Sequence, residues 1–200
     1  MGNPAGRQRR SRMKPAVFLD RDGTLNEDVG YLERVDRFEL YPWALDAIRL
    51  MRRAGYAVVI VTNQVGIARG MQDEAIVETV RELIDSRLRA IGEQLDGHYY
   101  CPHDPNAPVE AYRCVCHCRK PKPGMIEQAA RDLDLDVARS VVIGDKWGEV
   151  RLARNVGARA ILVRTGYGRT QEQMPRPDLE ADAVVDTLMD ATSWLLRHPA

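Results

Sequence analysis

An α/β fold with a doubly wound, Rossmann-like parallel sheet is predicted by two features of the sequence. Short apolar runs alternate along the chain with longer segments whose apolar residues recur at helical spacing. Several of the apolar runs end abruptly on polar residues, as parallel strands do where they meet a binding edge. Alternation of this kind implies right-handed crossovers, so the polar loops are expected to gather along one edge of the sheet.

Each strand is expected where a short apolar run is bounded by polar residues or glycine. The strands fall at residues 17–19, 57–61, 97–100, 141–143 and 160–163, and 183–185 is a candidate edge strand. Helices are expected between them at 43–54, from 73 to about 91, and at 123–133, 149–156 and 186–197. Asp73 is a plausible N-cap, and Pro123 suits the first turn of the helix that it opens. Residues 165–169 lack dinucleotide-binding or P-loop spacing and are expected to form a turn.

Length and charge limit the class of protein. The chain has 200 residues, which suits one domain at residues 14–200 without a large cap domain, preceded by a basic, disordered leader at 1–13. Lys plus Arg equals Asp plus Glu at 29 each, so binding to nucleic acid, which needs a basic surface, is not expected. No apolar stretch approaches the roughly 20 residues of a membrane helix. We therefore expect a cytoplasmic monomer with no membrane partner.

The first predicted strand runs into two carboxylates separated by one residue, in the sequence Asp-Arg-Asp-Gly-Thr at residues 20–24. Two other strands also end on polar residues, the second on Thr62 and the fourth on Asp145. Because carboxylates from different strands repel one another, burying Asp20, Asp22 and Asp145 together is costly without a cation. Mg²⁺ accepts a few oxygen ligands and commonly works beside phosphate. These three aspartates are therefore the predicted magnesium ligands.

Alternate residues at a strand end can face the same cavity, which suits a division of labour between the two aspartates. Asp20 is the predicted nucleophile, since a carboxylate can attack phosphorus and form an aspartyl phosphate. Asp22, kept protonated by the adjacent negative charge, would protonate the leaving group and later deprotonate the attacking water. Lys120 and the Thr62 hydroxyl would bind the equatorial oxygens of the phosphoryl group. These four residues form the predicted catalytic set.

Simpler interpretations exist for the same residues. Asp20 could open an EF-hand-like calcium loop, but Leu25 and Tyr31 occupy the positions of its glycine and its bidentate glutamate. The two aspartates of the first loop could be turn formers, and Asp145 could be a helix cap. Thr62, taken alone, could be an ordinary strand-end hydroxyl. The joint placement of these residues at strand ends is what favours catalysis.

All four cysteines lie in one short window that also contains histidine. Cys101 and His103 are followed, after twelve residues, by Cys116 and Cys118, and these four supply the closed tetrahedral ligand set of a structural Zn²⁺. The loop at 101–118 has little apolar content, so metal binding would supply folding free energy to it. The chain also offers substitutes for these ligands, namely Cys114, His98 and His117.

Taken together, the strand-end residues resemble the four ordered motifs of the haloacid dehalogenase-like phosphatases. The matching residues are Asp20, Asp22, Gly23 and Thr24, then Thr62, Asn63 and Gln64, then Lys120, and finally Gly144, Asp145 and Lys146. The resemblance implies a Rossmann-like fold, a magnesium ion and an aspartyl-phosphate intermediate. One position departs from the common pattern, because Glu149 stands four residues after Asp145 where aspartate is usual.

Within this superfamily, the cysteine window narrows the resemblance. Its twelve-residue gap and the neighbouring motifs closely resemble the heptose bisphosphate phosphatases, which implies a sugar bisphosphate substrate and a step in supplying activated heptose for bacterial surface polysaccharide. Histidinol-phosphate phosphatases carry a similar loop with a shorter gap and are the main alternative. The resemblance implies substrate contacts from Asp28, Val29, Gly30, Tyr31, Thr62, Asn63, Gln64, Val65, Arg119, Lys120 and Lys146.

Arg119 supports a bisphosphate substrate through its own chemistry. Its planar guanidinium, beside Lys120, offers a fork for a second anionic group beyond the one that reacts. Two other classes of protein remain as alternatives, namely a metal-stapled scaffold without catalysis and a phosphatase of nucleic-acid ends. The intact aspartates and lysine disfavour the first, and the neutral charge disfavours the second.

Overall fold

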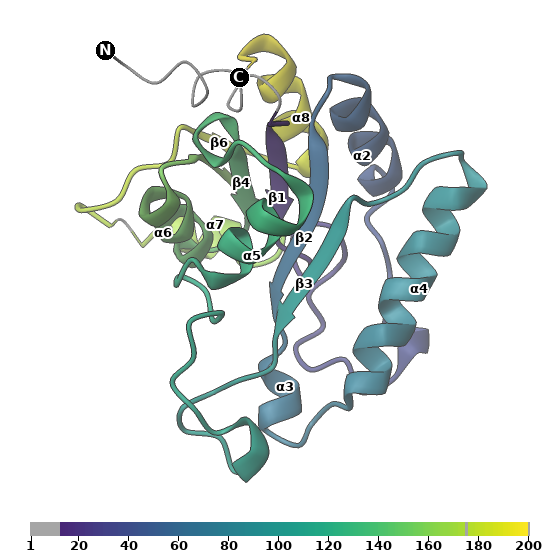
Figure 1. Ribbon diagram of the computed structural model, residues 1–200, viewed down its shortest axis with the longest axis vertical. Coiled ribbons are helices and arrows are strands. Elements are labelled where there is room, and N and C mark those ends of the chain that lie inside the picture. Colours follow the sequence, from purple (N-terminus) through teal and green to yellow (C-terminus); the bar gives the residue numbers. More distant parts are fainter. Residues whose placement is uncertain (1–12, 175, 200) are drawn as a thin grey trace.

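The computed structural model describes residues 13–174 and 176–199, and its centre is a six-stranded sheet (Figure 1). All neighbouring strands are parallel, in the order β3-β2-β1-β4-β5-β6. The strands are β1 (Ala16–Leu19), β2 (Ala57–Asn63), β3 (Gly97–Cys101), β4 (Val141–Gly144), β5 (Arg159–Val163) and β6 (Ala183–Val185). The predicted fold class is confirmed, edge strand included. The predicted leader, apart from Met13, lies outside the described residues.

Helices cover both faces of the sheet (Figure 1). One face carries α2 (Ala44–Arg53), α4 (Glu74–Ala90) and α8 (Leu188–Arg197), and the other carries α5 (Gly124–Leu133) and α6 (Trp147–Val156). Alternate residues of β1 supply the two cores, because successive side chains of a strand point to opposite faces. Val17 and Leu19 pack into the first core, and Ala16 and Phe18 pack into the second. This burial on both faces explains the uninterrupted apolar run.

The longer helices differ from the predicted ones mainly at their ends. α6 begins at Trp147 rather than at residue 149. α8 begins at Leu188, because Thr187 and Asp190 form a capping box in which each side chain bonds the other residue's backbone N–H. Asp73 is the N-cap residue of α4, as expected, but its side chain accepts no capping hydrogen bond.

Two short helices were not predicted. They are α3 (Val65–Ala68), directly after the end of β2, and α7 (Gly168–Glu172), which overlaps the segment expected to be a turn. Helices of about one turn are too short to show a periodic apolar pattern. In the described part of the chain, three 3-10 turns complete the helical elements, namely η1 (Val35–Arg37), η2 (Glu110–Tyr112) and η3 (Val137–Arg139).

The carboxyl ends of the parallel strands meet at one edge of the sheet, where open α/β proteins bind their ligands. Only η1, α2 and loops connect β1 to β2, so no cap domain separates these strands within the described part of the chain. The cysteine loop extends from the same edge of β3 and contacts the α3 segment, where Val109 N donates to Ala68 O at 3.2 Å (Figure 1).

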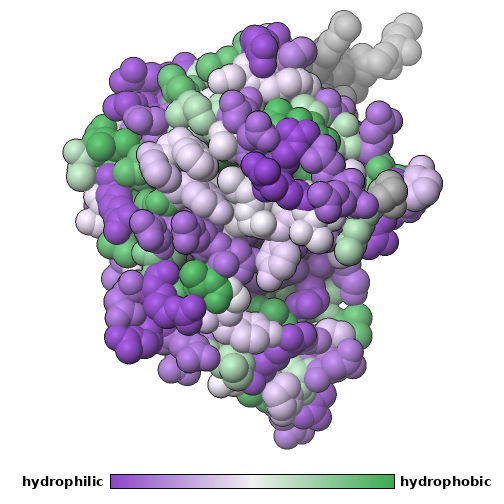
Figure 2. All heavy atoms as spheres, turned by 180° about the vertical axis from the view of Figure 1, so that it is seen from behind, coloured by the Kyte–Doolittle hydropathy of each residue, from purple (hydrophilic) through white to green (hydrophobic). Residues whose placement is uncertain are grey.

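The surface is mixed in character. Figure 2 shows polar side chains over most of one face, with hydrophobic side chains in small separate groups. Within residues 13–174 and 176–199, no helix combines the length and the apolar character needed to cross a membrane.

Candidate active site

Asp20 lies directly after β1 and belongs to a buried cluster of three carboxylates. Its backbone N–H donates to Ile143 O on β4 at 2.9 Å, which fixes the loop at the sheet edge. One carboxylate oxygen each of Asp20, Asp145 and Glu149 lies within 4.8 Å of the others. All three side chains are buried. The structure therefore brings together two of the three predicted magnesium ligands, with Glu149 as the third member in place of Asp22.

The cluster is short of positive charge. Burial, and then repulsion from Asp20, raises the pKa of Asp145 to about 7. Glu149 Oε2 is buried without a hydrogen-bond partner among the described residues, and Asp145 Oδ1 has only an ion pair with the Lys146 ammonium, at 3.4 Å. Orphaned buried carboxylate oxygens of this kind cost free energy unless a cation or another donor satisfies them. The donor set is all oxygen, which fits a hard divalent ion such as Mg²⁺.

Lys120 supplies the main positive charge inside the cluster. Its ammonium lies 2.8 Å from Asp20 Oδ1 and 2.9 Å from Glu149 Oε1. Burial by itself would lower the pKa of Lys120, but the charges of these two carboxylates outweigh it and raise the pKa. Asn63, at the end of β2, holds the lysine backbone from both sides: its Oδ1 accepts from Lys120 N at 3.1 Å, and its Nδ2 donates to Lys120 O at 3.3 Å.

Asp22 has a different environment from the cluster. Arg21 Nε and Nη2 donate to its two carboxylate oxygens at 3.0 and 2.8 Å, and Asn26 and Gln64 donate at 2.9 Å. Burial would raise the pKa of Asp22, but the Arg21 charge and these hydrogen bonds lower it. The expectation that Asp22 is kept protonated is therefore wrong for the protein without a bound substrate. The cause is that the Arg21 side chain turns back and bonds the carboxylate of Asp22. The order of the residues does not predict this contact.

Thr62 and Gln64 connect β2 to this network. Gln64 Nε2 donates to both Thr62 Oγ1 and Asp22 Oδ2 at 2.9 Å. Gln64 Oε1 in turn accepts from Arg21 Nη2 at 3.0 Å. The Thr62 hydroxyl is thus held at the base of the site, close to the general acid–base candidate, as the predicted catalytic set requires.

The loop after β5 completes the site and was missed by the sequence analysis. Thr165 Oγ1 donates to Gly23 O at 2.6 Å, and Tyr167 N donates to Asp145 Oδ2 at 2.8 Å. Gly23 and Gly166 have φ of +83° and +55°, and a Cβ on either would lie 2.3 Å from Asp145 Oδ2. Glycine is required at both positions for the loops to approach this carboxylate.

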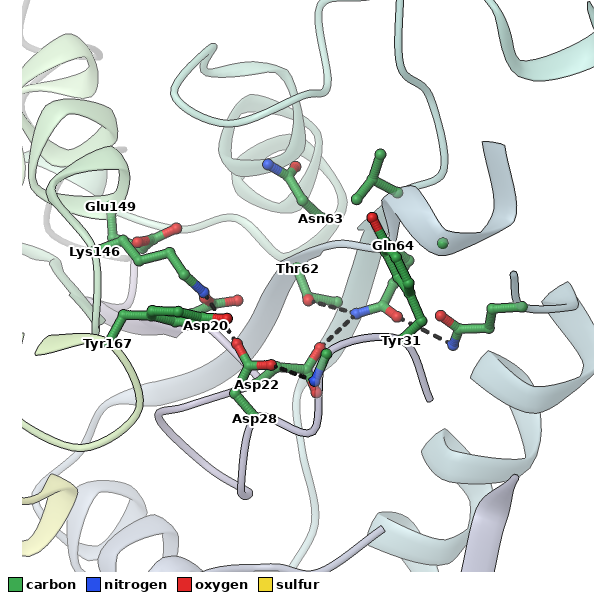
Figure 3. A pocket seen from close by; sticks show the side chains of 14 residues that line it. Asp20, Asp22, Asp28, Tyr31, Thr62, Asn63, Gln64, Lys146, Glu149 and Tyr167 are labelled. Atoms are coloured by element: carbon green, nitrogen blue, oxygen red, sulfur yellow. Dashed lines mark hydrogen bonds and ion pairs between the residues drawn. The ribbon is translucent and has the colours of Figure 1, made fainter. Parts of the chain in front are cut away.

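Beside the carboxylate cluster lies an open cavity of about 430 Å³ (Figure 3). The predicted substrate residues that line it are Asp28, Gly30, Tyr31, Thr62, Asn63, Gln64, Val65 and Lys146. Residues that line it without having been predicted as substrate contacts are Asp20, Asp22, Gly66, Gln72, Glu149 and Tyr167. Val29 instead packs against the hydrophobic core, and Lys120 is outside the lining, with its ammonium 2.8 Å from Asp20 Oδ1.

Arg119 also lies outside the lining of this cavity. Its Nη1 donates to the backbone oxygen of His103 at 2.9 Å. The guanidinium is therefore bonded to the cysteine loop, and its predicted contact with a second anionic group remains a prediction.

The four residues predicted to bind zinc come together at the edge of β3. The closest pairs are Cys101 and Cys118, with sulfurs 3.1 Å apart, and His103 Nδ1 and Cys118 Sγ at 3.4 Å. Cys116 Sγ lies 3.5 Å from Cys101 Sγ. Burial raises the pKa of the Cys101 and Cys118 thiols, so these sulfurs would not ionise together without a cation. The arrangement is compatible with a tetrahedral zinc site.

The substitute ligands lie outside this cluster. Cys114 is exposed, and His117 Nε2 lies 2.8 Å from Glu127 Oε2. His98 is the second residue of β3, three residues before Cys101. The predicted set of four ligands is thus the one that the fold assembles.

Comparisons with known proteins agree with this geometry. The pattern of the HAD-hydrolase-like family matches residues 117–191. A protein of Salmonella typhi named D-glycero-beta-D-manno-heptose-1,7-bisphosphate 7-phosphatase is 46% identical over 186 residues, covering 92% of this chain and 96% of that protein. The protein of the same name from Escherichia coli (strain K12) is 47% identical over 178 residues, covering 88% and 91%.

Solved structures show the same likeness. The crystal structure of D,D-heptose 1,7-bisphosphate phosphatase from B. bronchiseptica, complexed with magnesium and phosphate, superposes with a TM-score of 0.80 at 32% identity, covering 92% of this chain and 99% of that one. The corresponding phosphatase from Burkholderia thailandensis gives a TM-score of 0.66 at 27% identity, with coverage of 92% and 99%.

Proposed function

The chain belongs to the D-glycero-beta-D-manno-heptose-1,7-bisphosphate 7-phosphatases within the haloacid dehalogenase-like hydrolases, and from that membership we propose its substrate and the roles of its residues. It is a phosphatase that acts on a phosphate monoester in heptose biosynthesis. We propose that it removes the C7 phosphate of heptose 1,7-bisphosphate. The sequence left the anomer open, and the names of the relatives favour the β form.

One observation carries the proposed chemistry: the buried cluster of Asp20, Asp145 and Glu149, with Lys120 inside it and Asp22 beside it. Crowded buried carboxylates beside a cavity need cations, and cations held there can in turn bind a phosphate ester next to the Asp20 nucleophile. A scaffold protein would gain nothing from such an arrangement, since buried charge is costly to maintain.

In the first step, an oxygen of Asp20 forms a bond to phosphorus while the bond from phosphorus to the sugar oxygen breaks. The sugar oxygen takes the proton of Asp22. A phosphate bound beside Asp22 raises the pKa of that carboxyl by charge repulsion, which opposes the influence of Arg21 and favours the protonated form. Lys120 and the Thr62 hydroxyl bind the phosphoryl oxygens in the transition state.

In the second step, a water molecule attacks the phosphorus of the aspartyl phosphate. Asp22, now ionised, takes a proton from the water, and the bond from phosphorus to Asp20 breaks to release phosphate. The hydrogen bonds from Arg21, Asn26 and Gln64 hold Asp22 in its carboxylate form, as a general base requires. The enzyme is then restored to its starting state.

We propose that Asp20, Asp145 and Glu149 hold the magnesium ion, which would neutralise the carboxylates and the charge that develops on the phosphoryl group. The B. bronchiseptica phosphatase was solved with magnesium and phosphate, which supports this choice of ion. Asp22 was also predicted as a ligand, but its side chain lies outside the cluster of three and is bound by Arg21. We assign it to proton transfer.

We propose a structural zinc ion bound by Cys101, His103, Cys116 and Cys118. The loop at 101–118 would then be an insertion in a single domain at residues 14–200. The neutral composition supports a small-molecule substrate rather than nucleic acid. We further propose that the protein acts in the cytoplasm as a monomer, in the route to ADP-heptose or GDP-heptose for surface polysaccharide.

The test is phosphate release in the presence of Mg²⁺ from the β and α anomers of heptose 1,7-bisphosphate and from histidinol phosphate. We expect the highest kcat/KM with the β anomer. A preference for histidinol phosphate by about tenfold would replace the proposed substrate while leaving the reaction class intact.

A matched pair of variants tests the nucleophile in the same assay. Asp20→Asn should lower kcat by at least about 1,000-fold, because amide nitrogen and oxygen are poor nucleophiles. Asp46→Asn, an exposed aspartate on α2 that pairs with Arg49, should have wild-type kcat. Turnover of Asp20→Asn at the wild-type rate would exclude the aspartyl-phosphate route.

A further inference from the structure

Tyr167 is an aromatic residue of the cavity for which neither the motifs nor the proposed mechanism provides a role. It lies in the loop between β5 and α7 and lines the cavity together with Asp20, Asp22 and Lys146. Figure 3 shows its ring reaching into the cavity from the side opposite Tyr31. The residue is 48% exposed, so its side chain is accessible to a ligand in the cavity.

The backbone and the ring of Tyr167 are held in place, whereas its hydroxyl is not. The backbone N–H donates to Asp145 Oδ2 at 2.8 Å. The Lys146 ammonium lies 4.6 Å from the ring centroid, within the range of a cation–π contact. The phenolic oxygen has no hydrogen-bond partner within residues 13–174 and 176–199. The ring is therefore positioned by contacts that do not involve its hydroxyl, which leaves that group available to a ligand.

The charges around Tyr167 indicate which part of a ligand it would meet. Lys146 is already paired with Asp28 at 3.3 Å and Asp145 at 3.4 Å, so little free positive charge remains on this wall. A second phosphate would be poorly accommodated beside these carboxylates. A neutral group that both donates and accepts hydrogen bonds fits better. A sugar hydroxyl has this property, and a phenol can donate to it or accept from it.

We propose that Tyr167 is a substrate-binding residue whose hydroxyl forms a hydrogen bond with a hydroxyl group of the sugar chain. The inference rests on the proposed function, in which the substrate is a polyhydroxylated bisphosphate. The residue contributes to specificity, since a site that bonds a substrate hydroxyl discriminates against phosphate esters that lack one. The contact of the ring with the Lys146 ammonium restricts the position of the hydroxyl.

The variant Tyr167→Phe isolates the hydroxyl, because it keeps the ring, its contact with Lys146 and the backbone bond to Asp145. Two substrates are compared: heptose 1,7-bisphosphate and p-nitrophenyl phosphate, which has no sugar hydroxyl. The measured quantity is the ratio of kcat/KM for the first to kcat/KM for the second. We expect this ratio to fall by about tenfold, the size of one hydrogen bond between neutral groups.

Tyr99→Phe is the matched control, since it removes a phenol that bonds Asp132 at 3.0 Å on the surface. Its ratio should equal that of the wild type. An unchanged ratio in Tyr167→Phe, or an equal loss on both substrates, would overturn the inference and leave the proposed function standing. Failure of the wild-type protein to hydrolyse the heptose bisphosphate at all would overturn the proposed function, and with it this role for Tyr167.

Discussion

Lys120 and Asp20 form a buried ion pair: Nζ lies 2.8 Å from Oδ1, and only 2% and 7% of the two side chains are exposed. The pair joins the loop after β1 to the segment that follows the cysteine cluster. Glu149 shares the same ammonium, at 2.9 Å. The lysine thus has two functions in one place, because it neutralises the resting carboxylates and would face the phosphoryl oxygens during the reaction.

Replacing Lys120 by Met should reduce both catalysis and stability. We expect kcat to fall by at least about 100-fold, because a donor to the developing charge is lost. In Mg²⁺-free buffer the free energy of unfolding should fall by about 3 kcal/mol, since Asp20 and Glu149 are left buried without their partner. Phosphate release and urea unfolding measure the two effects.

Lys120→Arg is the companion variant, since it keeps the charge but changes the shape of the cation. It should retain more stability than the Met variant while remaining poorly active. If Lys120→Met unfolded at the wild-type urea concentration, the ion pair would not be neutralising the carboxylate cluster.

Substitutions of Glu149 and Asp22 are expected to change the Mg²⁺ dependence of activity in different ways. Glu149→Gln should raise the Mg²⁺ concentration for half-maximal activity by about tenfold or more, because it removes an ionised oxygen from the cluster. Asp22→Asn should lower kcat with little change in that concentration, since its carboxylate is bound by Arg21. Titration of activity with MgCl₂ distinguishes them. The reverse result would restore Asp22 as the metal ligand of the original prediction.

The members of the carboxylate cluster differ in how far the sequence could predict them. Asp20 and Asp145 were identified because a carboxylate after an apolar run has to lie at the binding edge of a parallel sheet. Glu149 was noted only as a departure from the family motif, and it joins the cluster because α6 begins at Trp147 and its first turn lies at the sheet edge. A two-residue difference in a helix start moves a side chain by more than half a turn, and the apolar pattern did not set that boundary.

The loop after β5 could not be predicted for a related reason. Its residues carry no motif, and their importance comes from neighbours that are distant in the sequence. Thr165 contacts Gly23, and Tyr167 contacts Asp145, because β5 pairs with β4 and places the loop over the carboxylate cluster. By contrast, the clustering of Cys101, His103, Cys116 and Cys118 was predictable, because metal chemistry restricts the residue types and the spacing brings them into one loop; their binding of zinc remains a prediction.

The cysteine cluster should contain zinc in the purified protein. We expect about one zinc ion per chain by mass spectrometry, and loss of that ion in Cys116→Ser. The thermal midpoint should fall in the variant because the loop has few apolar residues of its own. Cys114→Ser removes an exposed thiol outside the cluster and should keep both zinc and stability. Zinc-free wild-type protein with an ordered loop would contradict the assignment.

Arg119 should favour the bisphosphate over a monophosphate. Arg119→Ala is expected to raise KM for heptose 1,7-bisphosphate by about tenfold more than KM for the 7-monophosphate, because the guanidinium would bind the phosphate that does not react. Arg113→Ala is the control, since Arg113 also bonds backbone oxygens of the cysteine loop, those of Ala107 and Pro108. Equal increases in KM on both substrates would instead indicate that Arg119 acts through its bond to His103.

His98 should make stability depend on pH. It is the second residue of β3, and burial, followed by the positive charges of Arg21 and of Arg81 on α4, lowers the pKa of its imidazole from 6.5 to about 4. The folded protein therefore binds this proton more weakly than the unfolded chain does, and stability falls as the pH drops below about 6.5.

The test compares the wild type with His98→Gln, which cannot titrate in this range. Between pH 7 and pH 4.5 the wild type should lose about 2 kcal/mol more unfolding free energy than the variant, a value that follows from the two pKa values of the histidine. Taking the difference cancels the contributions of other groups, among them the cysteine cluster, because both proteins share them. Urea unfolding across this range measures it. Parallel pH profiles would mean that the imidazole is as easily protonated in the fold as in the unfolded chain.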